Sequence, residues 1–338
     1  MTLDREGRIV ATAQGVTATA TVTAIARMNR FGVLDQGFGE RGLAPFERSF
    51  QPRAIVVQNS GAIRIGGEAV AEDEPVVYGF TTDGHDDGLR ITGSTPVKQP
   101  VQYLMDQSGA LVASHARDKG SEGTLVRYAD NGARDPAFSP TAVERAVAIT
   151  ADGAFVTAGR SLDVDPRRFL ARRVTRDGQP DASFGGGSVA VPDVDRASGE
   201  IRVLARSSGG LVMVGVSGID QPNLFVARFD AAGALDASFG GRGYVTHDLG
   251  KTAIVAIAER TDGSLILAGT VPTSLAYRAL IVRLAPDGSL DTSFGQGGRL
   301  LLDKEFSSFS GLVVMADGEV IAGGSAGDAA LLMTFPPP

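Results

Sequence analysis

A short pattern of residues recurs along this chain at nearly regular spacing, and this repeat limits the folds that the chain can adopt. The copies differ in detail but keep an arginine, a glycine, an aspartate and the ending Phe-Gly or Phe-Ser. They are Ala26–Gly39 (ARMNRFGVLDQGFG), Val126–Ser139, Arg172–Gly185, Ala227–Gly240 and Val282–Gly295. Self-similarity at such a period is typical of solenoids, propellers and other arrays. We therefore expect one small structural unit to be repeated along the chain.

A second pattern precedes each copy: an apolar run, a turn that ends in glycine, and another apolar run. The turn glycines are Gly7, Gly61, Gly109, Gly153, Gly209, Gly263 and Gly318. They lie 44 to 56 residues apart, a spacing that suits one four-stranded propeller blade. The sequence therefore predicts an all-β fold, a seven-bladed β-propeller of four-stranded antiparallel blades, in which residues 1–338 form a single domain.

The sixth repeat shows the expected strands most clearly. They cover Ile254–Ala258, Leu265–Ala268, Leu280–Leu284 and Arg299–Leu302. Small and bulky residues alternate in the first strand of several repeats, for example Ala256, Ile257 and Ala258. We expect the small side chains to face the central axis and the bulky ones to pack between blades, because successive side chains of a strand point to opposite sides.

The two ends of the sequence bear on how the last blade is completed. The chain starts inside the first strand of blade one, and blade seven has three strands before Pro336–Pro338. Either one blade has three strands, or the strand that completes it lies outside this sequence. The prolines would then protect an exposed strand edge.

The repeated LD-x-SFG motif, preceded by an arginine strand and followed at repeat distance by a DG hairpin, resembles the bacterial delta-60 repeat. Proteins of that family are propellers of largely unassigned function, and the resemblance implies a bacterial origin without supplying catalytic residues. It covers nearly the whole chain, and blades one, four, five and six match best. Blades two and three depart from it, since Gly79 replaces the arginine and Ser139 replaces the last glycine.

Composition excludes several classes of function. The net charge of −7 and the pI near 5.1 argue against a nucleic-acid partner, because phosphate binding needs a concentrated basic surface.

No apolar run is long enough to span a bilayer, and residues 1–15 have no signal-peptide pattern. We expect a soluble monomer, either cytoplasmic or exported with an upstream segment that is not present here. The chain has no cysteine, so redox compartment stays undetermined.

The recurrent arginine and aspartate look functional in isolation. The pairs are Arg27 with Asp35, Arg127 with Asp135, Arg173 with Asp181, Arg228 with Asp236 and Arg283 with Asp291. A pair present in nearly every blade does not converge on one site. We interpret the aspartates as turn caps, the arginines as their partners and the following phenylalanines as core residues.

Metal sites have weak support. The segment from Asp83 to Gly88 resembles the start of a calcium loop, with Asp83, His85 and Asp87 at alternating positions. The glutamate expected at the twelfth position is missing, because Ser94 stands there. We interpret the segment as the blade-two turn, with calcium as the alternative, and expect no cofactor.

A ligand site on a propeller is expected at the mouth of the central tunnel, where loops from different blades converge. Charged and polar residues that differ from blade to blade are expected at the start of the first strands. They are Arg53, Gln102, Glu144, Arg145, Glu200 and Arg202. A solvated rim of mixed charge would look the same.

Three functions remain open at this point. The first is a non-enzymatic scaffold that binds protein, peptide or glycan, because no acid, base, nucleophile or metal set converges in the sequence. The second is a propeller enzyme of the metal-dependent lactonase or lyase type, with its site at the central tunnel. The third is a structural repeat of a surface assembly.

Overall fold

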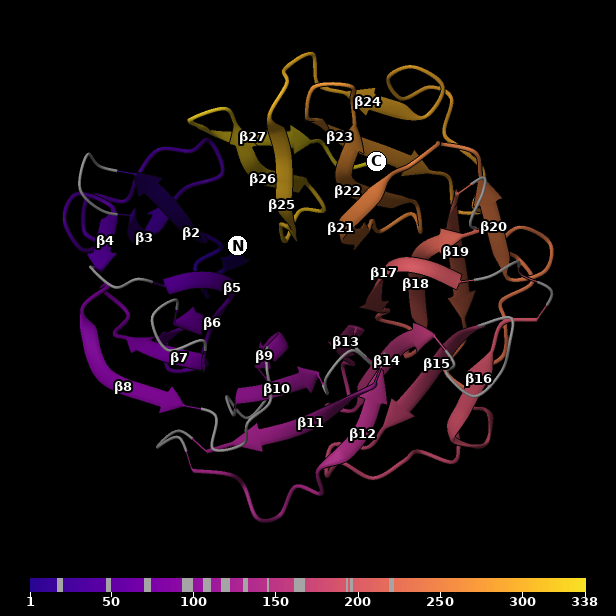
Figure 1. Cartoon of the computed structure of the whole chain (residues 1–338), viewed down its shortest axis with the longest axis horizontal. Coiled ribbons are helices and arrows are strands. Elements are labelled where there is room, and N and C mark those ends of the chain that lie inside the picture. Colours follow the sequence, from indigo (N-terminus) through magenta and orange to yellow (C-terminus); the bar gives the residue numbers. More distant parts are fainter. Residues whose placement is uncertain are drawn as a thin grey trace. The chain divides into compact units, whose positions relative to one another are not determined.

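The chain forms seven antiparallel sheets that follow one another in the sequence (Figure 1). This is a computed structural model, and it describes residues 1–16, 21–46, 50–69, 74–92, 100–105, 111–116, 122–129, 133–144, 146–160, 168–192, 194, 197–218 and 222–338. The chain divides into two compact units, Met1–Arg145 and Ala146–Pro338. The prediction of a single domain stays a prediction.

The first unit contains three four-stranded sheets. Sheet one comprises β1 (Thr2–Leu3), β2 (Ile9–Val16), β3 (Thr21–Met28) and β4 (Leu43–Phe46). Sheet two comprises β5 (Phe50–Val57), β6 (Ile63–Ala69), β7 (Glu74–Phe80) and β8 (Asp86–Thr92). Sheet three comprises β9 (Pro100–Met105), β10 (Leu111–Ala116), β11 (Glu122–Tyr128) and β12 (Thr141–Glu144).

The second unit contains four sheets, of which the last has three strands. Sheet four comprises β13 (Ala146–Ile149), β14 (Phe155–Arg160), β15 (Phe169–Val174) and β16 (Ser188–Ala190), with the short 3-10 turn η1 (Gly185–Gly187) before β16. Sheet five comprises β17 (Ala197–Ala205), β18 (Leu211–Ser217), β19 (Asn223–Phe229) and β20 (Tyr244–His247). Sheet six comprises β21 (Ala253–Glu259), β22 (Leu265–Pro272), β23 (Tyr277–Leu284) and β24 (Arg299–Leu301). Sheet seven comprises β25 (Ser307–Val314), β26 (Val320–Ala326) and β27 (Ala329–Phe335).

The seven sheets coincide with the seven predicted blades. Each described turn glycine joins the first two strands of its sheet and has a positive φ, between +74° and +89°. Side chains rarely tolerate this conformation, which explains why glycine recurs there. Gly109 lies outside the described residues. The three-stranded blade is also confirmed: it is sheet seven, and Pro336–Pro338 follow its last strand.

In the first strand of sheet six, the expectation that the bulky side chains pack between sheets is confirmed, whereas the expectation that the small ones face an axis is wrong. In β21, Ile257 packs with residues of sheet five such as Val214, whereas Ala256 and Ala258 pack with residues of sheet seven such as Phe309. Alternate residues of β21 therefore face the two neighbouring sheets. Neither the small nor the bulky side chains point to a central axis. The reason is that a blade lying between two others must bury both of its faces.

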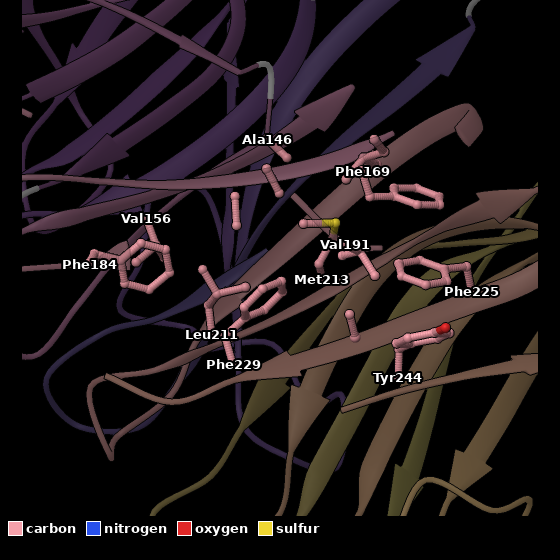
Figure 2. Packing of buried hydrophobic residues seen from close by; sticks show 14 residues of the cluster. Ala146, Val156, Phe169, Phe184, Val191, Leu211, Met213, Phe225, Phe229 and Tyr244 are labelled. Atoms are coloured by element: carbon pink, nitrogen blue, oxygen red, sulfur yellow. The ribbon is translucent and has the colours of Figure 1, made fainter. Parts of the chain in front are cut away.

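The cluster between sheets four and five shows how tightly these faces pack (Figure 2). The rings of Phe169 from β15 and Phe225 from β19 are stacked, with centroids 4.0 Å apart and an angle of 9° between their planes. Both side chains are fully buried, as are Phe184 and Phe229 in the same cluster. At roughly 25 cal/mol per Å² of buried apolar surface, aromatic contacts of this kind contribute much of the cohesion between sheets.

Among the described residues, the first strand of five sheets contains a β-bulge, and in three of these sheets a glycine of the second strand lies against a backbone carbonyl oxygen. The pairing of β21 with β22 shifts between Ile254 and Ala256, and similar shifts occur in sheets two, three, five and seven. A Cβ atom on Gly269 would lie 2.1 Å from the carbonyl oxygen of Ala253. Gly67 and Gly324 stand equally close to carbonyl oxygens of sheets two and seven. The bulge therefore determines the glycine in the second strand.

Replacement of this glycine tests the bulge requirement. Gly269→Ala places a methyl group against backbone that does not move easily, and we expect it to lower the free energy of unfolding by about 1–3 kcal/mol. Gly37→Ala is the matched control, because its Cβ meets only an aspartate oxygen at 3.5 Å. Chemical denaturation of both variants measures the difference. An equal effect of the two substitutions would show that the bulge does not constrain Gly269.

Candidate functional site

The recurrent arginine and aspartate form an ion pair in all five repeats. The Nε–Oδ2 distances are 2.8 Å for Arg27–Asp35, 2.7 Å for Arg127–Asp135, 3.3 Å for Arg173–Asp181, 2.8 Å for Arg228–Asp236 and 2.6 Å for Arg283–Asp291. Each aspartate also accepts a hydrogen bond from the backbone amide two residues later, at 2.8–3.1 Å. The interpretation of these residues as turn caps and their partners is confirmed.

The arginine also ties its sheet to the next one. In sheet five the guanidinium of Arg228 donates to the carbonyl oxygen of Pro286, which belongs to sheet six, at 2.8 Å. The same group lies over the ring of Phe239, 4.7 Å from its centroid. Arg27 makes the equivalent bond to the carbonyl oxygen of Thr82 in sheet two, at 2.7 Å. One guanidinium thus forms an ion pair with a carboxylate, a cation–π contact with an aromatic ring and a hydrogen bond to a carbonyl oxygen of the following sheet.

The phenylalanine of the repeat completes this contact between sheets. Phe239 is fully buried and touches Gly288 of sheet six, where a Cβ would lie 2.9 Å from the ring. The amide of the next residue, Gly240, donates to the carbonyl oxygen of Asp287 at 2.7 Å. The same arrangement joins Phe38 to Gly84, and Phe184 to Gly233. We call this set of arginine, aspartate and phenylalanine with the glycine of the following sheet the latch.

Sheet two has a rearranged version of the arginine–aspartate pair. Gly79 stands where other repeats carry the arginine, and Arg64 from the neighbouring strand β6 reaches the space above it. Arg64 Nη1 lies 2.7 Å from Asp87 Oδ2. A Cβ on Gly79 would lie 2.3 Å from Asp87 and 2.8 Å from Arg64. Arg64 therefore supplies the guanidinium partner of Asp87 that the missing arginine at position 79 would provide in other repeats.

In four of the five repeats, the pKa of the recurrent aspartate is lowered. The Ser238 hydroxyl, the Ser238 amide and the guanidinium of Arg228 lower the pKa of Asp236 below its ordinary value. The pKa of Asp35 is lowered by the amide of Gly37 and by the guanidiniums of Arg27 and Arg8. Such groups bind protons weakly at neutral pH and are poorly suited to donate one.

A small pocket lies between the first two sheets. Its volume is about 120 Å³, and its polar lining includes Arg5, Arg8 and Arg27. Arg8 is already engaged by three carboxylates: Asp4 at 2.7 Å, Glu6 at 3.0 Å and Asp35 at 3.0 Å. Ligand pockets for drug-sized molecules measure about 300–1,000 Å³, so this one suits only waters or a small polar group.

Sequence reasoning missed this pocket, although a signal was present. The turn marked by Gly7 reads DREGR, whereas the equivalent turns of sheets four and five read ADGA and SSGG. Asp4, Arg5, Glu6 and Arg8 are thus departures from the repeat, whereas Arg27 and Asp35 belong to it. Together, Asp4, Glu6 and Asp35 place three carboxylates around the Arg8 guanidinium.

Three of the six residues predicted at a tunnel rim have described surroundings. Arg53 is exposed and lies at the bulge of β5, between Pro52 and Ala54. Arg202 in β17 donates to the carbonyl oxygen of Val255 in β21, at 3.2 Å. Glu144 is buried and ends β12, the last strand of sheet three, so its expected place at the start of a first strand is wrong.

The other three predicted rim residues are described only in part. Gln102 lies in β9 and Glu200 in β17, whereas Arg145 lies outside the described residues. The described members come from both compact units. Their convergence on one site stays a prediction.

The weak metal candidates are engaged in other contacts. Asp87 pairs with Arg64, and Asp83 accepts a hydrogen bond from the Thr81 hydroxyl. His85 Nε2 lies 3.6 Å from Asp83 Oδ2, and both side chains are largely exposed. Within the described ranges, no group of three or more histidine and carboxylate residues is arranged to hold a metal ion. The segment forms the blade-two turn, as the first interpretation had it.

Comparisons with known proteins agree with this architecture. Residues 260–294 match the family model "Domain of unknown function (DUF5122) beta-propeller". The β-propeller domain of the Trilobed protease from Pyrococcus furiosus is similar with a TM-score of 0.53 and 9% identity, over 97% of this chain and 89% of that one. The fold is a β-propeller. No curated protein matches the chain.

Two further solved structures are similar over most of the chain. Hydrazine synthase from Kuenenia stuttgartiensis has a TM-score of 0.54 and 11% identity, over 86% of this chain and 88% of that one. A PL25 ulvan lyase has a TM-score of 0.52 and 9% identity, over 99% and 90%. At these identities the likeness shows the fold alone, because one fold hosts many unrelated functions. In the described part of the chain, no helix is long and apolar enough to cross a membrane.

The contact between Phe239 and Gly288 can be tested by adding one methyl group. Gly288→Ala combines an unfavourable positive φ, costing about 1–2 kcal/mol, with a clash against the ring, costing about 1–3 kcal/mol. Gly297→Ala in the same sheet is the control, because its φ is also positive but nothing lies within 4 Å of its Cβ. Equilibrium unfolding should show Gly288→Ala to be clearly the less stable variant. Equal stabilities would exclude the steric part of the latch.

The lowered pKa of Asp236 predicts a specific pH dependence. Its carboxylate contributes stability that is complete above the ordinary pKa of about 4 and is lost as pH falls through the folded-state pKa. Asp236→Asn should lower the free energy of unfolding by about 1–3 kcal/mol at pH 7. The difference in the free energy of unfolding between Asp236→Asn and the wild type should become smaller as chemical denaturation is repeated at lower pH, down to about pH 2.5. A gap that stays constant would mean that the charge of Asp236 does not contribute.

Proposed function

We propose that this propeller is a non-enzymatic binding or interaction scaffold. The observation that carries the proposal is the direction in which the pKa values of its aspartates are shifted. Every aspartate with a resolved shift, within the described ranges, has its pKa lowered by hydrogen bonds or arginines. A general acid needs a pKa near the working pH, which calls for a shift in the opposite direction.

The charges are also distributed in a way that suits a scaffold. The recurrent arginines and aspartates hold turns and join sheets, and the Arg8 cluster consists of mutually paired groups. A rigid framework of this kind leaves recognition to residues that differ between blades. We propose protein, peptide or glycan as the partner class. The six rim residues named above, Arg53 and Arg202 among them, remain candidates for contact.

The resemblance to the delta-60 repeat supports a bacterial protein without an assigned reaction. The similar structures include a synthase, the β-propeller domain of a protease and a polysaccharide lyase. Such diversity on one architecture favours no particular chemistry for this chain.

Metal analysis separates the scaffold from a metal-dependent lactonase or lyase. Protein purified without chelators and dialysed against metal-free buffer should contain far less than one equivalent of any divalent metal, and it should leave a panel of lactones unhydrolysed. Added calcium should not shift the melting temperature, because Asp87 is held by Arg64 and Asp83 by Thr81. A tightly bound stoichiometric metal or lactone turnover would overturn the proposal.

A further inference from the structure

Three apolar side chains stand out from the surface between sheets six and seven. Leu275 is 80% exposed, Phe306 57% and Tyr277 43%. The rings of Tyr277 and Phe306 meet edge to face, with centroids 6.2 Å apart and planes at 74°. Large exposed apolar groups that lie together are uncommon on proteins that act alone and mark sites of interaction. We call these three residues the aromatic platform.

The backbone at Phe306 is held in an unfavourable conformation. Its φ is +57°, and among the described residues other than glycine only Arg41 shares a positive φ. Left-handed backbone costs a residue with a side chain about 1–2 kcal/mol. Burial of the Phe306 side chain does not offset this unfavourable free energy, because more than half of the residue faces solvent. Strain of this kind is concentrated at functional sites.

Hydrogen bonds fix the platform from several directions. The amide of Phe306 donates to the carbonyl oxygen of Tyr277 at 2.9 Å, and its own carbonyl accepts from the amide of Gly327 at 3.0 Å. The Thr273 hydroxyl donates to Glu305 Oε2 at 2.8 Å and joins the loop that bears Leu275 to the loop that bears Phe306. The backbone that bears the two rings is thus held in place without a ligand, which lowers the entropy cost of binding.

Two carboxylates, Asp303 and Glu305, lie just before Phe306 in the chain, and both accept hydrogen bonds. Asp303 is fully exposed, and Arg278 Nη2 donates to its Oδ1 at 2.6 Å. Arg278 is itself anchored, since its Nε donates to the carbonyl oxygen of Leu302 at 2.6 Å. Glu305 is held by Thr273 in the same loop. Two carboxylates held by hydrogen bonds therefore lie within three residues of the exposed ring of Phe306 in the chain.

We propose that the aromatic platform, with Asp303 and Glu305, binds a neutral sugar ring of an oligosaccharide. The C–H face of a pyranose packs on an aromatic ring, and its hydroxyl groups donate to carboxylate oxygens. The two carboxylates disfavour acidic sugars, because like charges repel. This inference rests on the proposed binding scaffold and specifies the ligand class of one of its surfaces.

A glycan array followed by calorimetry with the strongest neutral oligosaccharide tests the proposal. Phe306→Gly removes the ring and relieves the positive φ, so the variant should be at least as stable as the wild type while its affinity falls about tenfold or more. Tyr277→Ala should weaken binding similarly, and Asp303→Asn should weaken it several-fold. Phe31→Ala is the control, because Phe31 is 83% exposed on the β3–β4 turn, away from the platform residues in sequence, and it should leave affinity unchanged.

Two outcomes would overturn the platform proposal. One is that the wild type binds no neutral oligosaccharide on the array. The other is that Phe306→Gly binds as tightly as the wild type. Neither outcome concerns the metal content or lactone turnover of the protein, so the failure of the platform is distinguishable from the failure of the scaffold.

Discussion

Each blade of this propeller must bury both of its faces, and the latch between neighbouring sheets is what makes their positions definite. Apolar packing alone is non-directional and allows sheets to slide. The latch adds direction: the guanidinium of Arg228 reaches a carbonyl oxygen of the next sheet, and Phe239 occupies the space over Gly288. Because neither contact tolerates displacement of more than a fraction of an ångström, the latch sets the register between sheets five and six. The same geometry recurs between sheets one and two.

The sequence predicted this architecture well because the residues that identify each blade lie close together in the chain and have few possible replacements. A turn glycine such as Gly263 is recognisable in a single sequence, since a positive φ leaves little choice of residue. The interpretation of Arg228 and Asp236 as architecture followed from their repetition alone. Blade number and the three-stranded blade could therefore be predicted without coordinates, and strand bounds in sheet six were correct to within a few residues.

The remaining features depend on contacts that no single sequence shows. Glu144 was misplaced because two strands are separated by one residue at that point, and the end of one resembles the start of the next. The exchange of Arg64 for the arginine missing at Gly79 crosses from one strand to its neighbour. Phe306 resembles an ordinary apolar residue, and only its φ and its exposure distinguish it. Function on this scaffold is thus to be sought where blades differ, while repeated residues report the fold.

Hydrogen exchange of the Phe239→Leu variant tests most directly whether the latch holds neighbouring sheets together. This substitution shortens the side chain that covers Gly288 without adding a polar group. We expect faster exchange at the amide of Gly240, which donates to Asp287, and at the turn of residues 285–288 in sheet six, while amides in the middle of β22 keep their protection. Faster exchange confined to sheet five, with the turn of sheet six unchanged, would contradict a latch between the two sheets.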